Sequence, residues 1–203
     1  MEVSAKFLEV ENSVQIPAGM IQPPFFEVGN PIAVNYGKLG MLAGHEMMHA
    51  FDLQESGYDS QGNFLYFWMV ETYLNYVNRS SCFISEYKNA GLKIVNDTNA
   101  EYRVKCENIC DSGGLKAAYR AFKNVEKKEK KETRLSEFPH LSSDQLFFLS
   151  YAQIWCSYDK NIDKYVTTHP EDEYRITVLL NNNPKFFDAF NCPKPDKEFC
   201  SIW

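Results

Sequence analysis

The chain has 203 residues, 44% of them hydrophobic and 15% aromatic, which suits one globular domain with a substantial core. Its formal net charge is −6, from 21 basic and 27 acidic residues, so nothing in the composition suggests a nucleic-acid partner. No apolar run reaches the roughly 18 residues that a transmembrane helix needs.

The predicted elements begin with a hairpin or edge strand over residues 1–18, where apolar and polar residues alternate loosely. Prolines and a glycine then predict an irregular apolar loop over 17–36. Helical periodicity follows in a series of segments: 37–54, about 66–89, about 99–112, 115–131, about 142–158, 171–182 and about 184–190. Gly113-Gly114 predicts a kink or joint between two of them. The expected fold class is mainly α with a small β edge, in a single domain spanning 1–203.

The pentapeptide HEMMH, which begins at His45, carries the clearest chemical signal. Residues four apart share one face of a helix, so His45 and His49 can bind one metal ion. Glu46 lies beside that face, where it can hold a water on the metal. Further along the chain, Glu107 would supply a third ligand from a second helix, and Asp111, one turn later, would orient a ligand histidine. Three protein ligands and one open position are typical of a catalytic zinc site and predict a metallopeptidase.

A polar helix face with two solvated histidines is the alternative interpretation of this motif. The small and apolar residues on either side, from Gly40 to Gly44 and at Ala50-Phe51, instead indicate a buried helix. Buried polar groups need partners, and a metal ion supplies one. Glu107 and Asp111, taken alone, are equally typical of a helix-end carboxylate and a surface cap.

Six cysteines favour an oxidising compartment, although six reduced buried thiols are the alternative. The triplets that begin at Asn78 and Asn96 match glycosylation sequons. The N-terminus, in contrast, lacks the basic start and apolar stretch of a signal peptide. The conflict suggests a piece of a larger secreted or membrane-anchored protein.

Several ordered motifs together resemble the C-terminal catalytic part of the neprilysin and endothelin-converting-enzyme family of zinc endopeptidases. These motifs are Pro17-Ala18-Gly19, Gln22-Pro23-Pro24-Phe25-Phe26, His45–Asp52, Glu107–Leu115, Gln145–Phe148, Ala152–Cys156 and Cys200–Trp203. The resemblance covers nearly the whole chain. It implies a gluzincin-type catalytic domain without the N-terminal lobe of the family.

The resemblance also implies roles for individual residues. His45, His49 and Glu107 would bind one Zn²⁺ per chain, Glu46 would be the general base, and Asp111 would assist a ligand. His169 falls at the position of the transition-state histidine, and Arg175 matches the arginine that contacts the substrate backbone carbonyl. The residues expected to form an apolar pocket for the side chain after the scissile bond are Met20, Phe25, Met41, Leu42, Ile154 and Trp155, for which core packing is the alternative.

Some positions depart from the family pattern. Ser4-Ala5 replaces an Asn-Ala pair that binds substrate backbone, which predicts weaker substrate binding, and Thr167 replaces an acidic residue near His169. Cys106 and Cys110 replace small residues beside Glu107, where they could oxidise, compete for metal or pack as small hydrophobic groups.

The resemblance further implies a disulfide between Cys82 and Cys200, whereas Cys156 and Cys192 would normally pair with cysteines in the missing region. It places the chain outside the cell or in a plasma-membrane ectodomain. The expected activity is hydrolysis of oligopeptides on the amino side of hydrophobic residues. Alternatives are a truncated, catalytically weak paralogue that binds zinc and peptides, and a metal-stabilised structural domain.

Overall fold

The computed structural model describes residues 4–65, 68–129, 134–156, 165–166 and 168–202. Helices dominate this part of the chain, which confirms the expected class of a mainly α fold with a small β edge. In chain order the elements are β1 (Lys6–Leu8), β2 (Ser13–Gln15), α1 (Ile32–Asn35), a π-helical segment (Tyr36–Gly40), α2 (Met41–His49), α3 (Val70–Asn89), α4 (Thr98–Glu129), α5 (Ser143–Ile154), α6 (Asp172–Asn181) and α7 (Pro184–Phe190), with 3₁₀ turns at Glu9–Glu11, Ala18–Met20 and Glu55–Gly57.

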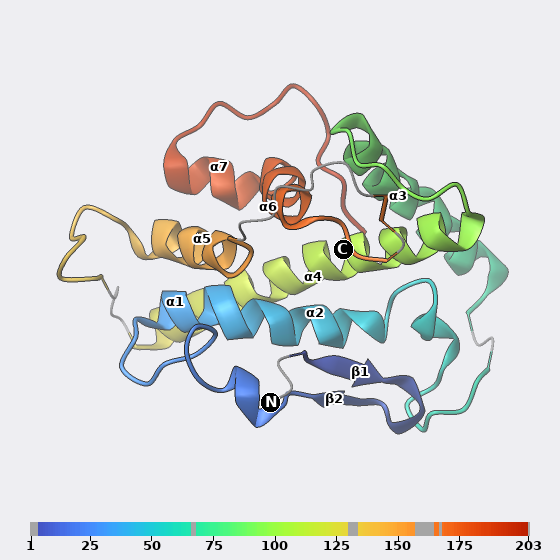
Figure 1. The fold of residues 1–203 in the computed structure, drawn as a ribbon, viewed down its shortest axis with the longest axis horizontal. Coiled ribbons are helices and arrows are strands. Elements are labelled where there is room, and N and C mark those ends of the chain that lie inside the picture. The colour runs from blue at the N-terminus through green and yellow to red at the C-terminus, as the bar shows by residue number, and fades with distance from the viewer. Residues whose placement is uncertain (1–3, 66–67, 130–133, 157–164, 167, 203) are drawn as a thin grey trace.

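The long helix α4 runs through the centre of the molecule, with α2 along one side (Figure 1). The hairpin of β1 and β2 lies on the outer side of α2, and α3, α5, α6 and α7 lie across α4 from it. The two strands pair antiparallel with Phe7 opposite Val14, so the predicted N-terminal hairpin is confirmed. This arrangement leaves the side of α2 next to β1 open to a cavity.

The helix that carries the HEMMH motif begins earlier and ends sooner than predicted. Pro31 precedes its first turn, and the helix continues from Ile32 through the π-helical segment to His49. The predicted loop over 17–36 is therefore wrong at its end. After His49 the Asp52 carboxylate accepts hydrogen bonds from backbone N–H groups two and three residues later, which turns the chain and stops the helix short of residue 54.

The predicted kink at Gly113-Gly114 is wrong, because α4 is continuous from Thr98 to Glu129. The glycines instead allow α2 and α4 to touch. A Cβ added to Gly114 would lie 2.5 Å from the backbone nitrogen of His45, and one added to Gly44 would lie 2.8 Å from the Gly114 carbonyl oxygen. Small residues at a helix crossing bring two backbones together, and here they bring the HEMMH segment into contact with the Glu107–Leu115 segment.

The main core is built around the middle of α4 and is rich in stacked and edge-to-face aromatic rings. Its buried members are Ala33, Met41, Leu115, Ala118, Phe122, Leu146, Phe147, Phe148, Tyr151, Leu179 and Leu180. Phe122 and Phe147 stack with centroids 5.6 Å apart. A second cluster joins α3, α4 and the C-terminal segment. Both clusters fix α4 against the rest of the chain.

The remaining helices fall within the predicted segments, but α3 begins only at Val70 and α5 ends already at Ile154, inside the predicted bounds of about 66–89 and about 142–158. α5 begins with a capping box between Ser142 and Gln145, and α6 and α7 fall at the predicted positions. The disulfide between Cys82 and Cys200, which the resemblance implied, joins α3 to the C-terminal segment. None of the helices described here combines the length and apolar character needed to cross a bilayer.

Candidate metal centre

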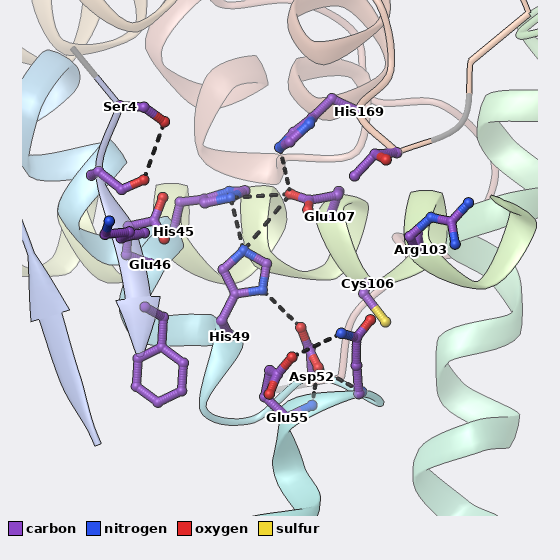
Figure 2. Close-up of a pocket in the computed structure, with 15 residues that line it drawn as sticks. Ser4, His45, Glu46, His49, Asp52, Glu55, Arg103, Cys106, Glu107 and His169 are labelled. Atoms are coloured by element: carbon purple, nitrogen blue, oxygen red, sulfur yellow. Dashed lines mark hydrogen bonds and ion pairs between the residues drawn. The ribbon is translucent and has the colours of Figure 1, made fainter. Parts of the chain in front are cut away.

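Helices α2 and α4 bring three atoms that could bind a metal ion to one point. His45 Nε2 lies 3.2 Å from His49 Nε2 and 3.2 Å from Glu107 Oε2. The distance from His49 Nε2 to the same Glu107 oxygen is 3.7 Å. Figure 2 shows the two imidazole rings and the carboxylate pointing toward one another, as the HEMMH spacing predicts. The structure thus brings together the three predicted ligands.

The other nitrogen of each ring is held by a carboxylate. His45 Nδ1 lies 2.8 Å from Asp111 Oδ1, and His49 Nδ1 lies 2.8 Å from Asp52 Oδ2. When each Nδ1–H donates to its carboxylate, each Nε2 turns a lone pair toward the Glu107 carboxylate. Glu107 Oε2 is buried and makes no hydrogen bond of good geometry among the described groups. Lone pairs that face a buried carboxylate repel one another, so this donor set fits a divalent cation, and two imidazoles with one carboxylate suit zinc.

The pKa shifts of the residues around the three atoms also favour a bound cation. Burial lowers the pKa of His45, but its close contacts with the carboxylates of Asp111 and Glu107 outweigh this effect and raise that pKa to about 9. Burial raises the pKa of Glu107, but its close contacts with His169 and His45 act more strongly and lower it below the usual range. Glu107 therefore remains ionised, and the site favours positive charge.

Asp52 is a site residue that the sequence reasoning missed. Its Oδ2 faces His49, while its Oδ1 accepts hydrogen bonds from the backbone N–H groups of Gln54 at 2.6 Å and Glu55 at 2.7 Å. The carboxylate is 1% exposed and so has a fixed position. The available signal was an acidic residue three positions after the second histidine, just beyond the end of the helix.

Asp111 is fully buried and joins the metal centre to Arg175. Arg175 Nε donates to Asp111 Oδ2 at 2.9 Å, and Arg175 Nη2 donates to Oδ1, the oxygen that also faces His45. The guanidinium lies 3.7 Å from the centre of the Trp155 ring. Arg175 is only 6% exposed, so in this structure its contacts are with the protein. The expected contact between Arg175 and a substrate carbonyl stays a prediction.

A cavity of about 320 Å³ is lined by His45, His49 and Glu107, the three candidate ligands. Its lining includes Ser4, Ala5, Lys6, Phe7, His45, Glu46, His49, Asp52, Gln54, Glu55, Arg103, Cys106, Glu107, Thr168 and His169. Glu46 lies on the side of the cavity next to β1, and His169 enters from the opposite side (Figure 2). His169 Nε2 lies 3.1 Å from Glu107 Oε2 with its side chain 53% exposed. Thr167 lies outside the described residues.

The six residues predicted for an apolar substrate pocket are absent from the lining of this cavity. Met41 is fully buried in the main core, and Leu42, Ile154 and Trp155 pack against that core. Met20 is buried and Phe25 is half-buried. Four of the six therefore lie around one hydrophobic cluster, and their role in binding a substrate stays a prediction.

The two cysteines beside Glu107 are buried thiols. Cys110 Sγ lies 3.4 Å from His49 Nδ1, and Cys106 lines the cavity. Burial raises the pKa of Cys106 to about 12 and that of Cys110 well above its usual value. Both thiols are therefore protonated at neutral pH, which favours packing over metal binding.

Comparison with known proteins gives a consistent result. The profile of peptidase family M13 matches residues 5–201. Neprilysin-1 of Caenorhabditis elegans is 35% identical over 99% of this chain and 28% of its own length. Human endothelin-converting enzyme 1 is also 35% identical, over 99% of this chain and 27% of its own length.

Two solved structures resemble the fold as well. A Haemonchus galactose-containing glycoprotein complex superposes with a TM-score of 0.83 at 26% identity, covering 99% of this chain and 32% of that one. The zinc metalloprotease Zmp1 of Mycobacterium tuberculosis, in complex with an inhibitor, superposes with a TM-score of 0.79 at 26% identity. The match covers 98% of this chain and 31% of that one. The chain spans less than a third of the length of these proteins. With the family profile matched almost from end to end, the chain belongs to peptidase family M13, as a neprilysin and endothelin-converting-enzyme type domain.

Proposed function

We propose that this chain acts as a zinc-dependent metalloendopeptidase on oligopeptides. The observation that carries the proposal is the convergence of His45 Nε2, His49 Nε2 and Glu107 Oε2 at the base of an open cavity. These three residues would hold one Zn²⁺. Zinc, when bound, supplies a Lewis acid that polarises a carbonyl oxygen and lowers the pKa of a water.

Glu46 is proposed to move the protons of the reaction. Its carboxylate lines the cavity one residue after the ligand His45. There it would accept a proton from the attacking water and deliver it to the leaving amine of the peptide. One carboxylate would thus act first as a base and then as an acid.

His169 is proposed to stabilise the oxyanion that forms on the peptide carbonyl. Its exposed imidazole lies at the mouth of the cavity, with Nε2 close to Glu107. An N–H of this ring would donate a hydrogen bond to the developing negative charge. Ser4 and Ala5, on the side next to β1, would bind the peptide backbone.

Cleavage on the amino side of a bulky hydrophobic residue is the proposed specificity. Leu42, Ile154 and Trp155 are half-buried at the edge of the main core, and apolar side chains of this kind favour an apolar partner. Their absence from the lining of the cavity favours the second candidate, a catalytically weak protein that binds zinc and peptides.

An extracellular or ectodomain location is proposed as well. The disulfide between Cys82 and Cys200 supports an oxidising compartment. Both asparagines of the sequons, Asn78 and Asn96, are exposed, so each is accessible to glycosylation.

The test is hydrolysis of an internally quenched peptide with a hydrophobic residue after the scissile bond. The wild-type chain should cleave it only with zinc present, and Glu46→Gln should bind zinc equally well yet lose nearly all turnover. A folded, zinc-loaded wild-type protein that binds the peptide without cleaving it would instead establish the second candidate.

A further inference from the structure

A second cavity lies on the face of α4 that points away from the metal centre. Lys116 follows Glu107 by nine residues, and at 3.6 residues per turn this spacing puts the two side chains on opposite faces of the helix. The cavity, of about 510 Å³, is lined by residues of α4, of the start of α7 and of the C-terminal segment. We call it the basic cavity; the lining residues used below are Lys116, Tyr119, Arg120, Lys123, Pro184, Lys185, Phe199 and Ser201.

The basic cavity is cationic although the chain as a whole carries a net charge of −6. Three lysines and one arginine line it, and none of its lining residues is acidic. Two of these cations have carboxylate partners just outside the lining: Lys123 lies 2.9 Å from Asp144, and Lys185 lies 3.3 Å from Asp188. These two positive charges are compensated by the protein.

Lys116 and Arg120 are not compensated in this way. Neither forms an ion pair with any carboxylate in the described part of the chain, and they lie one turn apart on α4. Lys116 is half-buried, and its Nζ donates to Ser201 Oγ at 2.7 Å. Burial, with the positive charge of Arg120, lowers the pKa of Lys116. Two neighbouring cations inside a cavity repel each other, and an anion bound between them would remove that repulsion.

Besides the polar side chains of Asn124, Asn183 and Ser201, the lining of the basic cavity includes three residues with flat apolar surface, Tyr119, Pro184 and Phe199. The Tyr119 hydroxyl donates to Asp144 at 3.1 Å, which holds its ring against the cavity. Phe199 packs on Phe187 with centroids 5.9 Å apart, and Pro184 opens α7. Flat apolar walls beside a few convergent polar groups are typical of small-molecule sites.

We propose that the basic cavity binds an oxyanion (a phosphate, sulfate or carboxylate) carried on a flat apolar body. Arg120 offers a planar fork that matches two oxygens of such a group, and Lys116 adds a point charge. Tyr119, Pro184 and Phe199 contact the apolar body. Because the site and the metal centre lie on opposite faces of α4, binding here is independent of zinc.

Calorimetric titration of the full chain with phenyl phosphate tests the proposal. Phenyl phosphate should bind at one site, at least about tenfold more tightly than inorganic phosphate or phenol, since each of these lacks one half of the ligand. Phenyl sulfate and benzoate, titrated in parallel, identify the preferred oxyanion. Absence of saturable phenyl phosphate binding at millimolar concentration would overturn the proposal.

Matched variants assign the binding to the basic cavity. Arg120→Gln and Lys116→Met should each weaken phenyl phosphate binding by about tenfold while zinc affinity stays unchanged. Lys127→Gln, which removes an exposed cation from the same helix outside the cavity, should leave both affinities unchanged. Arg120 is exposed, so its variant remains informative even where Lys116→Met fails to fold. Equal affinity in wild type and Arg120→Gln would contradict the proposal.

Discussion

Gly114 and His45 lie in backbone contact, since a Cβ on Gly114 would come within 2.5 Å of the His45 nitrogen. The metal centre therefore depends on how closely α2 approaches α4. The atoms that a Cβ on Gly114 would meet belong to the backbone of α2, so they cannot move aside unless the two helices separate.

Gly114→Ala should destabilise the fold by about 1–3 kcal/mol through overpacking and lower zinc affinity as well. Gly40→Ala is the matched control: the three atoms nearest to its added methyl all belong to the Tyr36 side chain, the nearest at 3.3 Å, and alanine also favours the helix. Chemical denaturation and zinc titration of both variants measure the effect. A Gly114→Ala protein as stable as Gly40→Ala would show that the helices tolerate separation.

Asp52→Asn should weaken zinc binding by about 10- to 100-fold, because the neutral amide no longer fixes the Nδ1–H tautomer of His49. The asparagine keeps a carbonyl oxygen for the turn that follows. Asp59→Asn is the control, since Asp59 accepts similar backbone hydrogen bonds from Gln61 and Asn63 in a nearby turn. Competition with a chromophoric chelator gives the affinities, and equal values for both variants would exclude a role for Asp52.

Arg175→Met should destabilise the protein by about 3–5 kcal/mol, because it leaves the carboxylate of Asp111 buried without its cation. Arg134→Met, at an exposed position, should change stability little. Adding Asp111→Asn to Arg175→Met should restore part of the lost stability, since it removes the uncompensated charge. Additive losses in the double variant would argue against this charge coupling.

Cys82→Ser should lower the free energy of unfolding by about 2–4 kcal/mol, because it opens the link between α3 and the C-terminal segment. Cys156→Ser removes an exposed free thiol and should have little effect. Thermal melts under oxidising conditions compare the two. The Cys82→Ser variant should also become insensitive to a reducing agent, whereas the Cys156→Ser variant should lose stability on reduction.

Local spacing was sufficient to predict most of the elements and the candidate metal ligands that the structure brings together, but it missed the start of the HEMMH helix and the continuity of α4. HEMMH puts two histidines on one helical face wherever that helix lies, and the hairpin, α6 and α7 follow from short patterns. The role of Gly114 was not predictable in this way. A glycine pair is equally typical of a kink and of a close helix crossing, and only the position of α2 decides between them.

The carboxylates that contact the two histidines, Asp111 and Asp52, also depend on tertiary contacts that the sequence does not reveal. Asp111 was expected one turn after Glu107, but its buried pair with Arg175 joins residues 64 positions apart. Asp52 escaped prediction because its function depends on how the chain turns after His49. The basic cavity is formed by residues of α4, of the start of α7 and of the C-terminal segment around Ser201. No local sequence pattern relates these three segments.

The central claim is that zinc is bound by His45, His49 and Glu107 and by no thiolate. X-ray absorption spectroscopy of the zinc-loaded chain tests it directly. The account predicts a shell of nitrogen and oxygen at about 2.0–2.2 Å with imidazole scattering from two histidines. Glu107→Gln should lose affinity, while Cys110→Ala should keep the spectrum unchanged. A sulfur shell at about 2.3 Å would mean that Cys106 or Cys110 binds the metal and would contradict the account.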